Sequence, residues 1–131
     1  MKKTPEEIES GLAQFYGTEG YTRLSPLHGR LVCTDGVVWL AENAECFWLI
    51  DAIASYQRDA MKDESLQSIQ FWKLTVKDRL GILICERDEG DVAFTQTIRF
   101  TNFPLPEIKI WVEAGSVGDK PVMVCLLPSE H

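Results

Sequence analysis

Asp51 is the residue whose type and surroundings most clearly suggest chemistry. It lies in the apolar run Cys46–Ala54, where every neighbour in the sequence is hydrophobic. A carboxylate in such surroundings must find hydrogen-bond partners or take up a proton, because burying an unpaired charge is costly. On a helix, Ser55 lies one turn later on the same face, and Arg58 lies about two turns later. The three side chains predict a polar strip on an apolar helix, which is either a ligand site or a structural network.

Thr34, Asp35 and Gly36 form a second group that has two interpretations. Asp35 could bind a metal ion or activate a hydroxyl group. A Thr or Asp placed directly before an apolar helical pattern also caps a helix, because its side-chain oxygen accepts hydrogen bonds from the free amides of the first turn. Capping requires fewer assumptions, so we expect Thr34 or Asp35 to begin the helix that carries Asp51.

No standard catalytic motif accompanies these residues. The sequence lacks a Gly-x-Ser-x-Gly elbow, a phosphate-binding glycine loop and a His-Glu-x-x-His helix. The histidines and cysteines do not have the spacing of a metal site, so we predict no metal and no cofactor. The cysteines are expected to be small buried hydrophobic residues in a reducing compartment: Cys33, Cys46, Cys85 and Cys125. The missing motifs favour a binding protein over an enzyme.

Length and charge limit the class of protein further. The chain has 131 residues, of which 45% are hydrophobic, and this predicts a single domain over residues 1–131. The net charge of −7 repels phosphate backbones and anionic membranes, so neither nucleic acid nor a membrane is an expected partner. No apolar run approaches the roughly 20 residues that would span a bilayer. Pro5 and Glu6 interrupt the start where an export signal would continue, which predicts a cytoplasmic protein.

The first half of the chain has helical periodicity. Thr4, Pro5 and Glu7 form a capping box that begins a short amphipathic helix. Glycines and prolines over residues 17–30 predict a loop with a short extended piece near residues 21–23. A longer apolar helix follows Thr34 and should end between residues 56 and 63. Asn43 is a poor residue for a helix interior, so this helix is either bent or divided near residues 42–45.

The second half changes to strand periodicity. Residues 69–76 are β-branched and aromatic, residues 82–85 and 122–127 are short apolar runs, and residues 92–100 alternate between apolar and polar. A turn is predicted at 78–81. Residues 107–114 fit a helix or a strand, and the glycine-containing loop at 115–120 favours the strand. These segments predict an α+β fold in which N-terminal helices pack on one face of a C-terminal antiparallel sheet of about five strands.

The chain contains four tryptophans, and their expected positions differ. Trp48 and Trp72 lie in strongly apolar segments and are expected in the core. Trp111 should point to solvent if Ile108, Ile110 and Val112 point inward. An exposed tryptophan on a sheet face suggests a protein interface, so Trp111 is the candidate interface residue.

Several segments together resemble a known family. They are Phe15–Glu19, Thr34–Val37, Leu40–Glu42, Trp48–Ser55, Trp72–Val76, Phe103–Leu105 and Leu127–Glu130. This set resembles a family of short bacterial and phage proteins that is catalogued only as a domain of unknown function. The resemblance covers nearly the whole chain, and it implies a bacterial or mobile-element setting without any activity. The residues similar to the family's pattern include Thr34, Asp35, Gly36, Asp51, Ser55 and Gln57.

The sequence supports two functional hypotheses from different classes. The first is a small cytoplasmic interaction module that binds a protein partner or a second copy of itself through the sheet face around Trp111. The alternative is a small-molecule-binding protein or enzyme with a pocket between helix and sheet near Asp51. In that case Thr34, Asp35 or Arg30 would lie at the mouth of the pocket.

Overall fold

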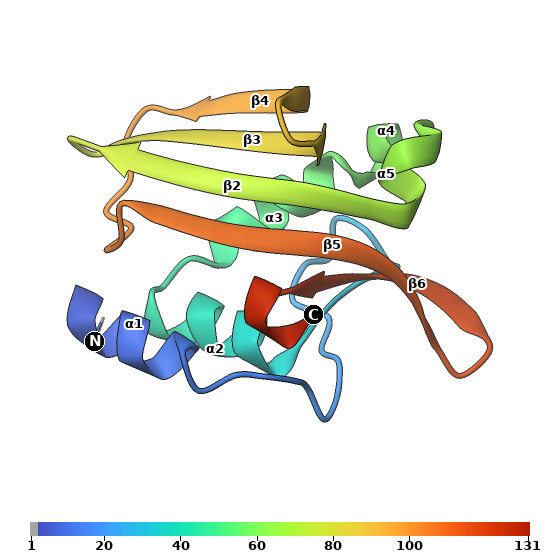
Figure 1. Cartoon of the computed structure of the whole chain (residues 1–131), viewed down its shortest axis with the longest axis horizontal. Helices are drawn as coiled ribbons and strands as arrows, with labels where there is room; N and C mark the ends of the chain where they lie inside the picture. The colour runs from blue at the N-terminus through green and yellow to red at the C-terminus, as the bar shows by residue number, and fades with distance from the viewer. Residues whose placement is uncertain (1–2) are drawn as a thin grey trace.

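A computed structural model describes residues 3–131, which form helices in the first half of the chain and a sheet in the second (Figure 1). The helices are α1 (Pro5–Leu12), α2 (Asp35–Asn43), α3 (Phe47–Ser55), α4 (Gln57–Ala60) and α5 (Glu64–Ser68). The strands are β1 (Leu31–Cys33), β2 (Ile69–Lys77), β3 (Leu80–Asp88), β4 (Asp91–Ile98), β5 (Glu107–Val117) and β6 (Lys120–Leu126). A short 3₁₀ helix, η1 (Pro128–Glu130), follows the last strand.

The six strands form one mixed sheet in the order β1-β6-β5-β2-β3-β4. Strands β2 to β6 pair antiparallel, so the predicted α+β class and the predicted strands are confirmed. The sequence did not predict β1, which pairs parallel with β6 through the partners Val32 and Val124. A strand of three residues has too little periodicity to be recognised, and its partner lies at the other end of the chain.

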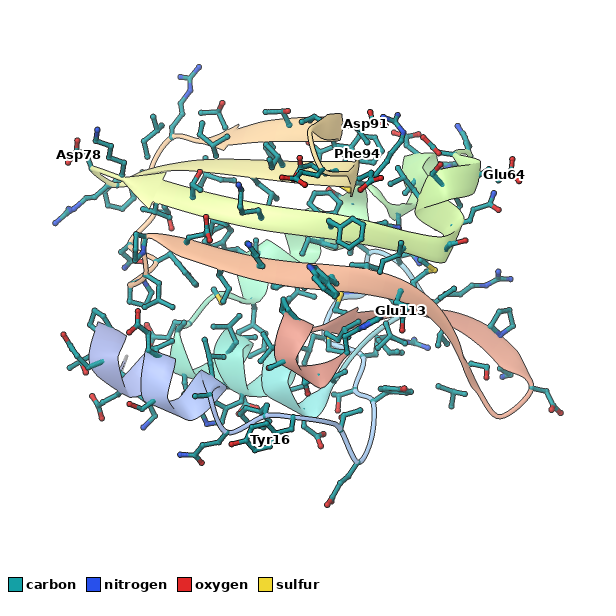
Figure 2. The ribbon with its side chains drawn as sticks, in the orientation of Figure 1. Tyr16, Glu64, Asp78, Asp91, Phe94 and Glu113 are labelled. Atoms are coloured by element: carbon teal, nitrogen blue, oxygen red, sulfur yellow. The ribbon has the colours of Figure 1, made fainter. Side chains whose placement is uncertain are left out.

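The helices cover one face of this sheet. Figure 1 shows α3 behind β5 and β2, whereas none of the described helices lies in front of β2, β3 and β4. The covered face supplies Trp72, Leu83 and Ile110 to the core, and α3 supplies Ile50 and Ile53. The other face is open to solvent, and Figure 2 shows its side chains directed toward the viewer. Within residues 3–131, no helix is long and apolar enough to cross a membrane.

The apolar segment after Thr34 divides into two helices, as Asn43 suggested. The N-cap of α2 is Thr34, whose hydroxyl oxygen accepts a hydrogen bond from the Val37 amide. At the other end of α2, the Asn43 side-chain amide donates to the Trp39 carbonyl oxygen at 2.8 Å. Glu45 has a φ of 52°, which no helix interior accommodates, so the chain turns there before α3 begins.

A buried pair of glutamine side chains connects the helical layer to the sheet. The amide nitrogen of Gln57 donates to the Gln70 oxygen at 2.8 Å, and Gln70 donates back at 2.9 Å. The Trp72 indole N–H also donates to the Gln70 oxygen at 2.8 Å. All three residues are buried, and buried polar atoms need hydrogen-bond partners. These three side chains supply such partners to one another. The similarity of Gln57 to the family's pattern has a structural explanation here.

Residues 115–120 differ from the sequence prediction of a loop. Strands β5 and β6 continue to Val117 and Lys120, which pair directly, and only Gly118 and Asp119 remain as a tight turn. Gly118 has a φ of 61°, a conformation that glycine adopts without steric cost. The two strands form a long hairpin that extends beyond the rest of the sheet (Figure 1).

Candidate functional site

Thr34 and Gly36 bind a carboxylate that belongs to the chain itself. The Thr34 hydroxyl donates to Glu130 Oε1 at 2.6 Å, and the Gly36 amide donates to Glu130 Oε2 at 3.1 Å. The Leu127 amide also donates to Glu130 Oε1, at 3.0 Å. A carboxylate at a helix N-terminus is stabilised by the free amides and the helix dipole. The anion position at the start of α2 is therefore occupied by Glu130.

Asp35 connects the loop before β1 to the same helix. Its carboxylate oxygen Oδ2 accepts a hydrogen bond from the Glu19 amide at 2.9 Å. Its own amide donates to the Thr18 hydroxyl oxygen at 3.0 Å. These contacts orient the loop and leave Asp35 in a structural position. Over residues 3–131, no three His, Cys, Asp or Glu side chains gather closely enough to hold a metal ion.

The structure places Asp51, Ser55 and Arg58 on two separate helices. Asp51 is half-buried on α3 and forms no hydrogen bond or ion pair with residues 3–131. The Ser55 hydroxyl donates to the Ala52 carbonyl oxygen at 2.6 Å, and Arg58 is exposed on α4 after the break at Tyr56. The three side chains are not joined by hydrogen bonds among themselves. Their use as a ligand site stays a prediction.

Trp111 lies on the helix-free face of the sheet, on the strand that the alternation predicted. Ile110 and Val112 are buried on the opposite face, which confirms the predicted orientation. The Trp111 ring meets Phe71 edge-on, with ring centroids 5.3 Å apart. It meets the His131 ring in the same way at 5.2 Å. Trp111 is half-buried by these neighbours, and its position on the face is fixed.

A shallow hollow of about 430 Å³ surrounds this aromatic pair. Phe71 and Trp111 contribute aromatic surface, and Lys73 and Lys109 contribute positive charge. Its acidic residues are Glu86, Asp88 and Glu89, which come from β3 and the turn after it. The hollow therefore combines aromatic surface with charges of both signs, a composition that favours contact with a protein surface.

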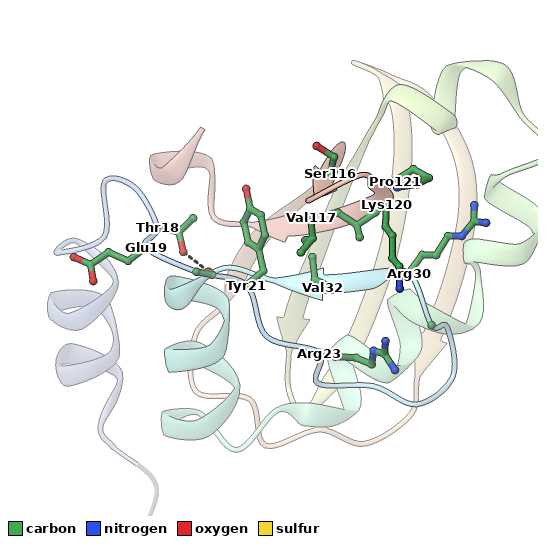
Figure 3. A pocket seen from close by; sticks show the side chains of 13 residues that line it. Thr18, Glu19, Tyr21, Arg23, Arg30, Val32, Ser116, Val117, Lys120 and Pro121 are labelled. Atoms are coloured by element: carbon green, nitrogen blue, oxygen red, sulfur yellow. Dashed lines mark hydrogen bonds between the residues drawn. The ribbon is translucent and has the colours of Figure 1, made fainter.

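Two larger concave surfaces lie on either side of the β5–β6 hairpin. One is a groove of about 740 Å³ between the hairpin, β1 and the loop at residues 18–23 (Figure 3). The other has about 490 Å³ and is lined mainly by apolar residues, including Met61 and Met123. Asp51 lines none of the four cavities that we describe, a shallow fourth one beside η1 included. Among the residues of the large groove, the sequence analysis named only Arg30 as a candidate site residue. The other residues were missed because the walls of the groove come from segments far apart in the chain.

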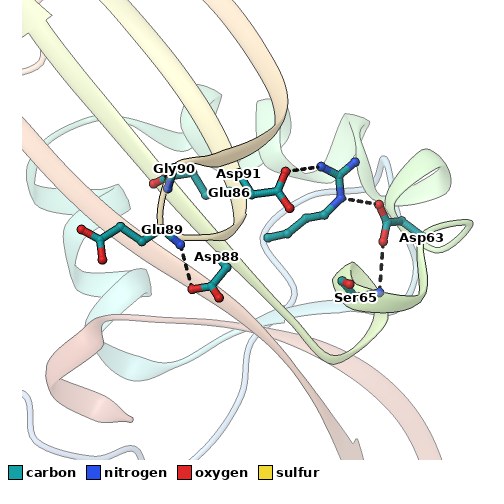
Figure 4. A network of polar contacts seen from close by, with 8 residues as sticks. Asp63, Ser65, Glu86, Asp88, Glu89, Gly90 and Asp91 are labelled. Atoms are coloured by element: carbon teal, nitrogen blue, oxygen red, sulfur yellow. Dashed lines mark hydrogen bonds and ion pairs between the residues drawn. The ribbon is translucent and has the colours of Figure 1, made fainter.

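A network around Arg87 joins α5 to the β3–β4 hairpin (Figure 4). Arg87 Nε donates to Asp63 Oδ2 at 2.7 Å, and Arg87 Nη1 donates to Asp91 Oδ1 at 3.0 Å. Asp63 Oδ1 also accepts from the Ser65 amide, which caps α5. The hydrogen bond from Arg87 is the main cause of a lowered pKa of the Asp63 carboxyl. Every charge in this network has a partner, so we assign it a structural role.

Comparison with known proteins identifies the family of the chain. Residues 6–131 match a family described as "Family of unknown function (DUF6876)". No curated protein and no solved structure is significantly similar to the chain. The match covers nearly all of the sequence and agrees with the resemblance found in its segments. The chain therefore belongs to this family of unknown function.

Proposed function

We propose that this protein is an interaction module that self-associates through the helix-free face of its sheet, with Trp111 at the centre of the contact. The observation that carries the proposal is the aromatic pair of Trp111 and Phe71 on the face of the sheet that helices α1 to α5 leave open. Tryptophan is enriched among the residues that dominate interface energies. Phe71 and His131 already restrict the Trp111 ring, so association costs little side-chain entropy.

The charges around the pair support a second copy of the chain as the partner. Lys73 and Lys109 are direct partners across β2 and β5, where like charges repel each other. Glu86 and Glu89 lie in the same hollow and carry the opposite sign. A face with both signs is self-complementary about a twofold axis, because each acidic region can meet the lysine pair of the other copy. A purely acidic protein partner would pair with the lysines of this surface but would repel its acidic residues.

Sedimentation equilibrium tests this proposal on the intact chain. We expect the wild-type protein to form a dimer, and we expect Trp111→Ala to weaken it by roughly 30-fold, the effect of losing about 2 kcal/mol at an interface hot spot. Phe47→Ala is the matched control, because Phe47 is 44% exposed on α3, away from the sheet face. Lys109→Glu should weaken the dimer, and Lys109→Glu combined with Glu86→Lys should restore part of the affinity. A wild-type chain that stays monomeric at high concentration would refute self-association.

The pocket near Asp51 receives less support from the geometry. Asp51 lines none of the four described cavities, and it has no polar partner among residues 3–131. A bound ligand would need a concave surface beside this carboxylate. The sheet face is therefore the better candidate.

A further inference from the structure

The groove beside the β5–β6 hairpin has a basic end. Three cationic side chains line it: Arg23, Arg30 and Lys120. They come from the loop before β1, the residue before β1 and the start of β6. Figure 3 shows the Lys120 side chain extending from the hairpin toward the start of β1, with Arg23 on the loop beside this strand. The Arg30 side chain is directed away from Arg23, and Glu19 lies at the opposite end of the groove. We call this surface, with its volume of about 740 Å³, the basic groove.

The three cations have no acidic partner in the part of the chain that the structure describes. Among residues 3–131, none of them forms an ion pair with a carboxylate. The chain has 20 acidic and 13 basic residues, so acidic partners are plentiful elsewhere on the surface. Three cationic side chains that line one groove raise the positive potential there, and a bound anion would neutralise it. This end of the groove therefore favours an anionic ligand despite the net charge of the whole chain.

The backbone that carries the cations is fixed. The Arg30 carbonyl oxygen accepts a hydrogen bond from the Met123 amide at 2.8 Å. Thr22, the neighbour of Arg23, exchanges two backbone hydrogen bonds with Cys33 at 2.7 and 2.8 Å. Lys120 pairs with Val117 at the tight turn of the hairpin. A ligand would therefore order side chains without having to order the loops, which lowers the cost of binding.

Part of the remaining wall of the groove is apolar. Tyr21 is 45% exposed and Val117 is 49% exposed, and both line the groove together with Val32 and Val122. Large apolar side chains exposed around a concavity gain free energy when a ligand covers them. The volume lies within the range of small-molecule sites. The groove therefore suits a ligand with a charged head and an apolar or aromatic body.

We propose that the basic groove binds a small organic phosphate, with the phosphate held by Arg23 and Lys120 and by the exposed Arg30 side chain, which turns toward it on binding. The organic body packs on Tyr21 and Val117. A phosphomonoester carries close to two negative charges, which suits three cations better than a single carboxylate does. Arginine also presents paired N–H donors that match phosphate oxygens. The site is lined by none of the residues of the Trp111 hollow, so it stands independently of the proposed self-association.

Titration followed by ¹⁵N–¹H NMR, with phenyl phosphate as the probe, tests the proposal on the full chain. Phenyl phosphate should shift the amides of Gly20, Gly29 and Lys120, and it should bind more tightly than inorganic phosphate, while phenol alone should not bind. Arg30→Gln and Lys120→Gln should each weaken binding by about tenfold. The matched control is Lys77→Gln, which removes an exposed cation from β2 and should leave the affinity unchanged. Tyr21→Ala should weaken the binding of phenyl phosphate but not that of inorganic phosphate.

Three results would overturn the proposal. The first is an absence of shifts in the groove amides at about 10 mM phenyl phosphate, which is far above the Kd expected of a specific site. The second is an equal loss of affinity in Lys77→Gln and Arg30→Gln, which would indicate charge attraction without a site. The third is tighter binding of benzoate than of phenyl phosphate, which would reassign the groove to carboxylates. Thermal melts of each variant confirm that the fold is retained, since all the substituted side chains are exposed.

Discussion

The Thr34 hydroxyl donates a hydrogen bond of 2.6 Å to Glu130 Oε1, and the two residues are 96 positions apart in the chain. Thr34 thus caps its own helix and also holds the carboxylate that completes the cap. Gly36 and Leu127 donate to the same carboxylate. This group of contacts binds η1 to the start of α2, and it is a long-range polar connection that stability measurements can isolate.

Removal of the Glu130 carboxylate should destabilise the fold. Glu130→Ala leaves the Thr34 hydroxyl and the Gly36 amide without their partner, and Thr34 is 2% exposed. An unsatisfied buried polar group costs about 1–3 kcal/mol, so we expect a loss of that size in urea denaturation. Ser129→Ala, at the exposed neighbouring residue, is the control and should leave the midpoint unchanged. Equal midpoints for the two variants would show that the connection contributes no stability.

Gly36→Ala should destabilise the protein through a steric clash at the same place. A Cβ atom at position 36 would lie 2.6 Å from Glu130 Oε1 and 2.7 Å from Leu127 Cδ1. Both distances are too short, so the Glu130 and Leu127 side chains would have to move, and overpacking of this kind costs about 1–3 kcal/mol. Gly17→Ala is the control, because a Cβ atom there meets nothing within 4 Å. In the Glu130→Ala background the penalty of Gly36→Ala should shrink, and an unchanged penalty would contradict this explanation.

Trp72→Ala should cost more stability than Trp48→Ala. Trp72 is 2% exposed and its indole N–H donates to the Gln70 oxygen, so the substitution creates a cavity and removes one of the two hydrogen bonds to that oxygen. We expect a loss of about 3–5 kcal/mol, measured by chemical denaturation. Trp48 is half-buried at the margin of the core, so Trp48→Ala should cost less stability. The opposite order would mean that the core is centred on α3 instead of on the sheet.

The four cysteines should not react with thiol reagents in the native protein. All four are buried, and burial raises the pKa of the Cys85 thiol to about 12. A hydrogen bond with Cys33, together with burial, also raises the pKa of Cys125. The thiolate forms of Cys85 and Cys125 are therefore scarce at pH 8. An Ellman assay should detect four thiols in guanidinium chloride and almost none before unfolding, and rapid native reaction of one thiol would contradict the burial.

The stability of the protein should fall as the pH decreases below about 6.5. Burial, with a smaller contribution from Arg30, lowers the pKa of His28 below its ordinary value of 6.5. The unfolded chain then takes up the proton first, so folding loses stability between pH 6.5 and the lower pKa of the folded state. An NMR titration of the imidazole should give a midpoint below 6.5. Arg30→Gln should raise that midpoint, and no movement would exclude Arg30 as a cause.

Local patterns predicted most of the elements of the fold, because caps and alternation act over a few residues. The Thr4 capping box, the Thr34 cap and the strand that carries Trp111 were all visible in the sequence. The strand β1 and the basic groove depend on contacts between distant segments, which no local pattern contains. This is why the sequence named Arg30 but not its neighbours in the groove.

The prediction for Asp51 shows how an apolar run can mislead. Leu49, Ile50 and Ile53 are buried and form one side of α3. Phe47 and Trp48 lie on the more exposed side together with Asp51. Because apolar residues occupy both sides of this helix, the sequence does not show which side is buried. The carboxylate therefore lies at the margin of the protein, where water can reach it.

The pairing of β1 with β6 also restricts the order of folding during synthesis. Helix α2 and strand β1 leave the ribosome early, but the neighbour of β1 in the sheet is the last strand of the chain. Until β6 is available, Leu31 and Cys33 keep an unpaired edge, although α2 and α3 can already form. Contacts of such high sequence separation slow folding and leave apolar surface exposed for longer. The first strand of this sheet is therefore completed only when the last strand has been made.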